Sequence, residues 1–557
     1  MLFKHYRVTL SLILVFCAGG LKVVAQQQSQ TGQFSGYFET NGQYYRNDST
    51  IGTSEAKEKW LNNGFMTLSY AYKNLTAGIR YESYLNALQG FDPNYKGNGI
   101  VNRFVTYQGE KLTVTAGNFY EQFGSGLVFR TYWEPNLGYD NSMDGIRAVF
   151  TPSAGITLKG VIGRQRDFFD IGSGIVRGVD ADIQINDAVK QLSASKLKIG
   201  IGGSFVSKYQ KDDKLTYILP ENVGAWATRI MLRYGKVAFD AEYAYKINDP
   251  SQANGFLYNY GESFFTNLTY TQKGLGVRLS GKRVDNMDYR SDRGVTLNRL
   301  LINYLPAVNR QQTYRLATLY PYATQTLGEM GGSAEIYYTF KPKSQLGGAY
   351  GTTIMASFAA VSDIERNNLD DTLGYTSPFL GIGSDRFYQE FTLEVTKKLS
   401  RSSKIVASYL YQVYDRVRLE GKPPSELTAH LGIIEYTYKI SSKQSLRIDA
   451  EHLYTDQDRG NWAMLLAEYT IAPHWSIAVF DEWNYENFEF DYKDWNFKED
   501  FLEKGTHYFN GSLTYVTGGT RIGLGWARQR AGLLCVGGVC RFVPASNGAT
   551  LTISSRF

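Results

Sequence analysis

The stretch GATLTISSRF, residues 548–557, ends the chain and decides the expected fold. Leu551, Ile553 and Phe557 alternate with polar residues, so one face is mostly apolar and the other polar. A period of two indicates a strand whose faces meet different environments. Any β-domain can end on such a strand. We prefer the closing strand of a bacterial outer-membrane barrel, with Phe557 as the barrel-closing residue and insertion signal.

The N-terminus indicates export. Lys4 and Arg7 precede an apolar run over residues 8–18, and Val-Val-Ala precedes Gln26. This order of charged, apolar and small residues predicts a signal peptide over residues 1–25. Lipidation at Cys17 is disfavoured, because Phe16 stands where a small residue is expected. We therefore expect a short flexible segment over residues 26–32 and a single barrel domain over residues 33–557.

Composition fits an outer-membrane location. No later stretch offers about eighteen consecutive apolar residues, so an exported chain that enters a membrane must do so as a barrel. Aromatic residues make up 15% of the chain and 42 of them are tyrosines, which suits the two interfacial belts of a barrel in outer-membrane lipid. The 59 basic residues nearly balance 53 acidic ones, which gives no reason to expect nucleic acid as a partner.

Segments with a period of two recur along the whole chain, with short turns and long loops alternating between them. About eleven short-turn hairpins and one strand at each end predict an all-β, transmembrane antiparallel barrel of about 24 strands, within a range of 22–26. No repeat with the period of a β-propeller is present. The predicted strands are 34–45, 65–72, 75–85, 100–107, 112–120, 146–150, 156–164, 175–185, 197–209, 223–234, 237–247, 263–271, 275–284, 332–340, 351–361, 387–397, 405–417, 427–439, 445–454, 462–471, 475–483, 507–516, 521–528 and the C-terminal strand.

Charged residues fall on the polar faces of these strands. A charge at the middle of the lipid face costs about 2–4 kcal/mol for Arg or Lys, so we expect these faces to line the lumen. Either a structural ion-pair network or a selective conducting path accounts for them. The predicted lumen-lining residues are Arg80, Glu82, Asp240, Glu242, Arg278, Lys282, Glu390, Glu394, Arg447, Asp449 and Glu451.

Two long loops stand out. Residues 285–330 contain four tyrosines between positions 303 and 325, with Pro306 and Pro321 breaking any long strand. This segment either folds inward as a plug or constriction, or outward as an extracellular cap. Residues 481–501 interleave aromatic and acidic residues. An interfacial belt that runs into a solvated loop is the simpler interpretation, and a loop that binds sugars or cations is the alternative.

Cys535 and Cys540 are the two cysteines that remain after the signal peptide is removed. Export favours a disulfide between them, which would clip the last extracellular loop. A metal site needs more ligands than this segment offers, so we expect no metal and no cofactor.

Histidines give no support for an enzyme. His430 and His452 lie at similar distances from the turn at Ser441, so they are placed on adjacent strands and suggest a metal or catalytic pair. Each shares its face with aliphatic residues, however, which predicts an interfacial position facing lipid. We expect no catalytic site.

Three segments carry a family resemblance. Residues 121–147 (EQFGSGLVFRTYWEPNLGYDNSMDGIR), 303–325 (NYLPAVNRQQTYRLATLYPYATQ) and 535–544 (CVGGVCRFVP) together resemble an uncharacterised family of Bacteroidetes outer-membrane β-barrel proteins. The resemblance implies the fold and the location. Some Bacteroidetes barrels are subunits of larger export or assembly complexes.

The leading functional hypothesis is a porin-like or substrate-selective channel with a mixed-charge lumen. The alternative is a non-transport subunit of a larger complex, or a surface ligand-binding protein, with the lumen closed by residues 285–330. Expected partners are outer-membrane lipid, the barrel-insertion machinery and other outer-membrane proteins. TonB-coupled uptake is not expected, because strands begin within about ten residues of the cleavage site and leave no room for a separate plug domain.

Overall fold

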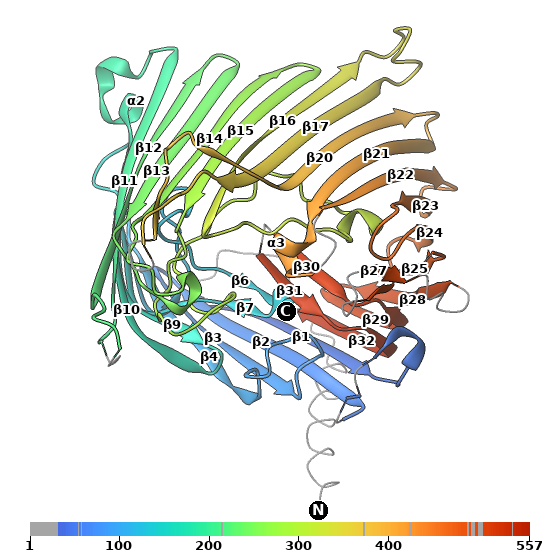
Figure 1. The fold of residues 1–557 in the computed structure, drawn as a ribbon, viewed down its shortest axis with the longest axis horizontal. Coiled ribbons are helices and arrows are strands. Elements are labelled where there is room, and N and C mark those ends of the chain that lie inside the picture. The colour runs from blue at the N-terminus through green and yellow to red at the C-terminus, as the bar shows by residue number, and fades with distance from the viewer. Residues whose placement is uncertain are drawn as a thin grey trace, which may run out of the picture.

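The computed structural model describes residues 32–53, 55–56, 58–212, 216–370, 374–422, 426–486, 489–491, 496–498, 505–536 and 539–557. The predicted signal peptide lies outside the described residues. Within them, 24 antiparallel strands form one closed barrel (Figure 1), which confirms the predicted fold class and strand number. Among the described residues no helix is long and apolar enough to cross a membrane.

The barrel strands follow the chain in order. They are β1 (Gln33–Tyr44), β2 (Trp60–Tyr72), β3 (Leu75–Leu85), β4 (Gly97–Gln108), β5 (Leu112–Phe119), β8 (Met143–Phe150), β9 (Ile156–Asp167), β10 (Asp170–Gln184), β11 (Leu197–Tyr209), β12 (Asn222–Tyr234), β13 (Val237–Lys246), β14 (Gly261–Gln272), β15 (Leu275–Asp285), β16 (Gly328–Phe340), β17 (Thr352–Ile364), β20 (Ile382–Lys398), β21 (Ser403–Asp415), β22 (Glu426–Lys439), β23 (Gln444–Tyr454), β24 (Trp462–Ile471), β25 (Trp475–Asn484), β28 (Thr506–Thr517), β29 (Thr520–Gln529) and β32 (Ser546–Arg556).

The loops carry short elements of their own. Small antiparallel pairs are formed by β6 (Trp133–Glu134) with β7 (Tyr139–Asp140), β18 (Asn367–Asn368) with β19 (Tyr375–Thr376), β26 (Glu489–Asp491) with β27 (Asn496–Lys498), and β30 (Gly532–Val536) with β31 (Val539–Val543). Short helices are η1 (Ser49–Ile51), η2 (Pro135–Leu137), α2 (Ile185–Ala188), η3 (Lys190–Leu192), η4 (Gln252–Asn254), η5 (Leu316–Thr318) and α3 (Arg416–Glu420).

The C-terminal strand closes the barrel, as its sequence predicts. β32 pairs with β29 along one edge and with β1 along the other. Beyond the strand, the Phe557 N–H donates to Gly36 O at 3.1 Å, and the Gly36 N–H donates to Phe557 O at 2.7 Å. The Phe557 side chain stays 54% exposed. Both termini of the barrel therefore meet at one end of the cylinder.

The two ends of the barrel differ in their connections. At the short-turn end, tight turns such as Lys73-Asn74 join successive strands, and Lys73 adopts a positive φ of 51° there. At the long-loop end, the connections include residues 120–142 and 286–327. One tight hairpin, between β9 and β10 at Phe168 and Phe169, also lies at the long-loop end. The start of β1 and the end of β32 lie at the short-turn end.

Observed strands differ from the predicted ones chiefly at the long-loop end. β2 begins at Trp60, five residues before the predicted start at 65. The polar pair Asn62 and Asn63 hides the alternation there, yet both residues pair with β1 and Asn63 is buried. Asn63 faces the inside of the barrel with Leu61 and Phe65, whereas Asn62 takes the outward position and donates to Thr40 Oγ1 at 2.8 Å, so polar residues on both faces extend the strand at this end.

Outward positions carry exposed apolar side chains, as a wall in contact with lipid requires. On β12, Trp226 and Ile230 are exposed on the outer face, while Val223, Ala225 and Ala227 are buried on the inner face. The barrel therefore has an apolar outer face. At its long-loop end the inner face is also shielded from solvent, because loop residues pack against it.

Candidate functional site

Two long-loop connections turn back into the barrel and fill its interior at the long-loop end. We name residues 120–142, between β5 and β8, the first inward segment, and residues 286–327, between β15 and β16, the second inward segment. Figure 1 shows both as loops that cross inside the ring of strands. Phe123, Leu127 and Tyr289 in these segments are fully buried. Residues 285–330 were predicted to form either a plug or a cap, and the structure shows a plug.

The first apolar cluster joins both inward segments to one wall. Phe123, Leu127 and Phe129 come from the first segment, and Met287 and Ile302 from the second. The segments also bond to each other, since the Arg130 N–H donates to Ile302 O and the Tyr304 N–H donates to Gly126 O, at 2.8 and 2.9 Å. The wall contributes Val161 of β9, Val176 of β10, Val206 of β11, Val223, Ala225 and Ala227 of β12, Ala244 of β13 and Val284 of β15.

The second apolar cluster lies against the opposite wall. We name residues 306–324 the crossing loop. From this loop Leu316, Tyr320 and Tyr322 pack against the inner face of strands β17 to β24. The wall side of this contact includes Val361, Phe387, Tyr388, Leu410, Tyr414, Leu427, Ala429, Leu431, Ile433, Leu453, Trp462 and Met464. The second inward segment therefore spans the lumen from one apolar wall to the other.

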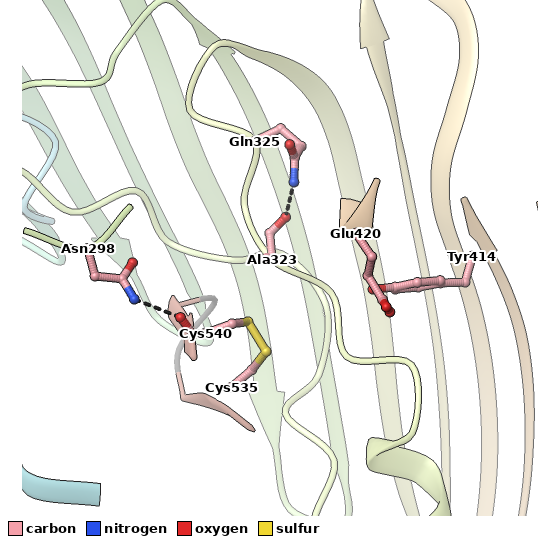
Figure 2. Close-up of a disulfide and its surroundings, with 7 residues drawn as sticks. All are labelled: Asn298, Ala323, Gln325, Tyr414, Glu420, Cys535 and Cys540. Atoms are coloured by element: carbon pink, nitrogen blue, oxygen red, sulfur yellow. Dashed lines mark hydrogen bonds between the residues drawn. A yellow bond between two sulfur atoms is a disulfide. The ribbon is translucent and has the colours of Figure 1, made fainter. Parts of the chain in front are cut away.

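The crossing loop leaves and returns at one place. Thr324 Oγ1 donates to Leu305 O at 3.4 Å. Lys282 of β15 bonds to both ends, donating to Pro306 O at 2.8 Å and to Thr324 Oγ1 at 3.2 Å, and it pairs with Glu329. After the return, Gln325 Nε2 donates to Ala323 O at 2.9 Å (Figure 2).

Wall carboxylates hold the inward segments by their backbone. Glu451 on β23 accepts the N–H groups of Arg315 and Leu316 at 2.9 and 2.7 Å. Glu242 on β13 accepts the Ser125 N–H of the first inward segment at 2.7 Å. These buried carboxylates supply acceptors that loop backbone inside a barrel otherwise lacks. Both residues were predicted to line the lumen, and the structure places them against the plug.

Side chains of the crossing loop make further polar bonds with the same wall. Gln312 donates to Glu390 Oε1 at 3.0 Å, and Arg310 lies 3.3 Å from Glu394 Oε2. Arg315 pairs with Glu482 of β25, which also accepts from Arg530 Nε at 3.1 Å. Glu482 is fully buried and was not among the predicted residues.

Arg80 and Glu82 belong to a buried, charge-balanced cluster. Arg166 of β9 lies 2.6 Å from Glu82 and 2.7 Å from Asp140 of the first inward segment. Arg80 pairs with Glu82 at 2.9 Å and with Asp140, and its guanidinium lies 4.1 Å from the Trp133 ring. Burial acts to raise the pKa of Asp140, but Arg80 and Arg166 together hold it below the usual range. Two cations and two anions thus fix the first inward segment to the wall.

The remaining predicted charges lie nearer the short-turn end, and most keep contact with solvent. Asp240 pairs with Arg233 at 2.8 Å, with both side chains partly exposed. Arg447 lies 2.9 Å from Glu435 and 3.3 Å from Asp449, which is buried. Arg278 is exposed on the inner face. The lumen therefore has a packed half at the long-loop end and a charged, wetter half at the short-turn end.

A cavity of about 360 Å³ lies between the inward segments at the long-loop end. Tyr132, Tyr139 and Tyr304 line it together with Asn298, Asn303 and several threonines and leucines. Asp288 and Arg290 also line it, and they neutralise each other through a two-bond pair of 2.6 and 2.7 Å. The volume falls within the range of about 300–1,000 Å³ typical of small-molecule sites.

The disulfide hairpin β30–β31 borders this cavity. Cys535 and Cys540 form the predicted disulfide, and Asn298 of the second inward segment donates to Cys540 O at 2.7 Å (Figure 2). Arg541 donates to Asn136 O of the first inward segment at 3.1 Å. The hairpin is therefore attached to both inward segments.

His430 and His452 lie on the outer face of the barrel, where each meets a tyrosine, and their interfacial role stays a prediction. Tyr409 Oη lies 2.7 Å from His430 Nδ1, and Tyr485 Oη lies 2.7 Å from His452 Nε2. Register places Gly432 opposite His452, so the two histidines are diagonal neighbours. The residues that the structure describes contain no group of three His, Cys, Asp or Glu side chains able to hold a metal. Part of the aromatic stretch 481–501 lies outside the described residues.

The fold and the filled interior together define a transmembrane β-barrel plugged by its own loops. Residues 5–557 match the Family of unknown function (DUF6029), and the chain belongs to that family.

Solved structures with a similar fold are distant. The siderophore receptor PirA from Pseudomonas aeruginosa shares 8% identity, with a TM-score of 0.40 over 95% of this chain and 81% of that one. A mutant of the ferric enterobactin receptor PfeA from Pseudomonas aeruginosa shares 9% identity, with a TM-score of 0.42 over 94% and 80%. OpdQ from Pseudomonas aeruginosa shares 8% identity, with a TM-score of 0.33 over 94% and 97%. These likenesses say nothing about what this chain binds. No curated protein matches the chain.

Proposed function

We propose that this protein is an outer-membrane barrel whose lumen is closed to free diffusion and whose outer face binds a ligand. In this arrangement the long-loop end is extracellular and the short-turn end periplasmic, as is usual for such barrels. The observation that carries the proposal is the crossing loop, which is anchored on the far wall by Glu451, Glu482 and an apolar cluster. The cavity beside the disulfide hairpin is then the place for a ligand.

A substrate-selective channel is the second candidate. It is favoured by the charged, partly exposed lumen at the short-turn end, where Asp240, Arg278 and Arg447 lie. In such a channel the crossing loop would act as a gate. A subunit of a larger outer-membrane complex is compatible with the closed lumen, and its surface contacts would then matter more than its interior. None of these roles uses a catalytic group.

Conductance in planar bilayers tests the closed lumen. The contact between Leu305 and Thr324 allows residues 307–323 to be replaced by a two-glycine linker without moving β15 or β16. We expect the full-length barrel to show no steady conductance and the deletion variant to show large, stable openings. A folded barrel is verified in both proteins by its heat-modifiable migration on a gel.

A matched control shortens a connection of similar length at the opposite end of the barrel. The β16–β17 connection, residues 341–351, lies at the short-turn end, and its hydrogen bonds, such as Lys343 N–H to Gly348 O at 2.6 Å and Thr352 Oγ1 to Leu346 O at 2.8 Å, stay within the hairpin. This variant should remain closed. Steady conductance of the full-length protein equal to that of the deletion variant would overturn the closed lumen and favour the channel.

A further inference from the structure

The outer wall around β9 and β10 carries an unusual group of charges, which we name the arginine patch. It consists of Arg103 on β4, Asp144 on β8, Arg164 on β9 and Arg177 on β10. The side chains face outward, because their strand neighbours Met143, Gln165 and Val176 are fully buried on the inside. Arg103, Arg164 and Arg177 are exposed. β9 and β10 lie at the left of Figure 1.

Register brings the patch together. Asp144 lies directly opposite Arg164, and Ile175 lies on the other side of Arg164. Arg177 is two residues beyond Ile175, which makes it the diagonal neighbour of Arg164 on the same face. Diagonal neighbours have β-carbons within about 7–8 Å, so two long arginine side chains reach a shared anion.

The patch carries a net positive charge. The Asp144 carboxylate lies 3.1 Å from Arg103. Among the described residues Arg164 has no carboxylate within ion-pair distance, and Arg177 donates to the neutral Asn222 at 2.9 Å. The Asp167 carboxylate, near the tip of the β9–β10 hairpin, is already paired with Arg299, whose Nη2 lies 2.7 Å from Asp167 Oδ2. Asp170 is exposed at that tip, beyond the patch. Three cations therefore share one anion.

The patch borders the apolar band of the wall. Ile146, Ile162 and Val179 hold the next outward positions toward the short-turn end, and they are 53%, 47% and 59% exposed. An uncompensated arginine is costly deep in the lipid face and costs little at the interface, where lipid headgroups lie. The guanidinium group binds phosphate with two parallel hydrogen bonds, which a single lysine does not achieve.

We propose that the arginine patch binds the phosphate group of a lipid headgroup in the membrane leaflet at the long-loop end. Arg164 and Arg177 hold the phosphate, and Arg103, already paired with Asp144, adds to the positive field. The acyl chains of the lipid then lie over Ile146, Ile162 and Val179. The site is independent of the lumen, so it holds whether or not the barrel conducts.

Native mass spectrometry of the purified barrel in neutral detergent tests this site. The probes are phosphorylated lipid A, the same lipid after enzymatic removal of its phosphates, and inorganic phosphate. We expect the wild-type barrel to retain phosphorylated lipid A and the R164Q/R177Q variant to bind it about tenfold more weakly. The R164K/R177K variant keeps the positive charge but lacks the planar guanidinium group. Its affinity for phosphorylated lipid A should lie between those of the wild type and the R164Q/R177Q variant.

The matched control is R386Q. Arg386 is also exposed at the long-loop end, but it forms a pair with Glu426 at 2.9 Å, so its loss should leave lipid binding unchanged. Equal retention of lipid A by the wild type and R164Q/R177Q would overturn the proposal. So would equal binding of the dephosphorylated lipid, or binding of inorganic phosphate as tight as that of the lipid. Migration on a gel verifies that each variant is folded.

Discussion

At the scale of single residues, Asp48 fastens the seam where the barrel closes. Its carboxylate lies 2.6 Å from Arg528 Nε and accepts from Asn547 Nδ2 at 2.8 Å. Arg528 belongs to β29 and Asn547 to β32, whereas Asp48 follows β1. The hydrogen bond from Arg528 is the largest cause that holds the pKa of Asp48 well below its ordinary value of 3.8. One side chain thus joins both sides of the β1–β32 seam.

Replacing Asp48 by Asn should loosen this end of the seam. A partly exposed pair of this kind contributes about 1 kcal/mol. We expect faster hydrogen exchange at the Arg46 N–H, which bonds to Asn547 O at 2.7 Å. Asp385→Asn is the control, because it removes an exposed partner of Arg418 on another strand and should leave exchange at the seam unchanged.

The same carboxylate predicts a pH dependence. The lowered pKa means that folding favours the ionised form, so the contribution is complete above the ordinary value of 3.8 and is lost as pH falls toward the lower folded value. Hydrogen exchange at Arg46, compared between pH 6 and pH 3 after correction for the intrinsic rate, should show more opening at low pH in the wild type. In D48N this pH effect should be absent, and an equal effect in both proteins would show that Asp48 is not its source.

Glu451 anchors the crossing loop through two backbone N–H groups. In Glu451→Ala these buried donors of Arg315 and Leu316 lose their acceptor, at a cost of about 1–3 kcal/mol each. We expect the crossing loop to exchange hydrogen faster and brief conductance openings to appear, while the barrel stays intact. Glu468→Ala provides the comparison, since Glu468 lies 3.6 Å from Arg447 and away from the crossing loop. Unchanged exchange in E451A would contradict the anchoring role.

At the scale of elements, the sequence predicted well which strand residues face outward, and predicted only in part which residues face inward. β3 and β11 have the predicted bounds, because lipid outside and polar groups inside give a clean alternation. β22 is different. Leu427, Leu431 and Ile433 face inward and are buried by the crossing loop, whereas Thr428 and His430 take the outward positions at this end. The apolar face therefore points inward where the strand meets the plug, which is the reverse of its direction nearer the short-turn end, where Ile434 is exposed on the outside.

The inward direction of the two segments was not predictable from sequence. Tyrosine and proline in residues 303–325 suit a plug and a cap equally. The signal that sequence reasoning missed is the group of apolar residues Phe123, Leu127, Val128 and Phe129, which lies inside a loop that has no lipid face to cover. Glu482 was missed because it stands next to the exposed Trp483, in a stretch interpreted as an aromatic loop.

The disulfide hairpin is a local element, and its loss should not affect the barrel. The closed ring between Cys535 and Cys540 is short, so its loop-entropy contribution is about 2 kcal/mol and acts on the hairpin alone. In C535S/C540S we expect faster proteolysis within residues 530–545 and unchanged heat-modifiable migration. A variant in which Arg541 is replaced by Gln keeps the disulfide but loses the bond to Asn136, and it should show a weaker effect of the same kind. Loss of the folded barrel band would contradict this view.

At the scale of the whole molecule, we expect the terminal aromatic residue, Phe557, to act in assembly of the barrel. Phe557 reaches beyond β32, pairs with Gly36 by backbone and leaves its ring exposed at the short-turn end. We expect Phe557→Gln to lower the amount of barrel found in the outer membrane several-fold, with the melting temperature of the assembled fraction nearly unchanged. Phe34→Gln, at the neighbouring exposed end of β1, is the control. Equal yields of wild type and F557Q would show that the residue is not an insertion signal.

The contact between Leu305 and Thr324 makes the interior of this barrel accessible to redesign. Because the chain enters and leaves the crossing loop at one point, where Lys282 bonds to Pro306 and Thr324, we expect β15 and β16 to keep their register when this loop is exchanged. A designed variant can then receive a new interior by replacement of the crossing loop alone.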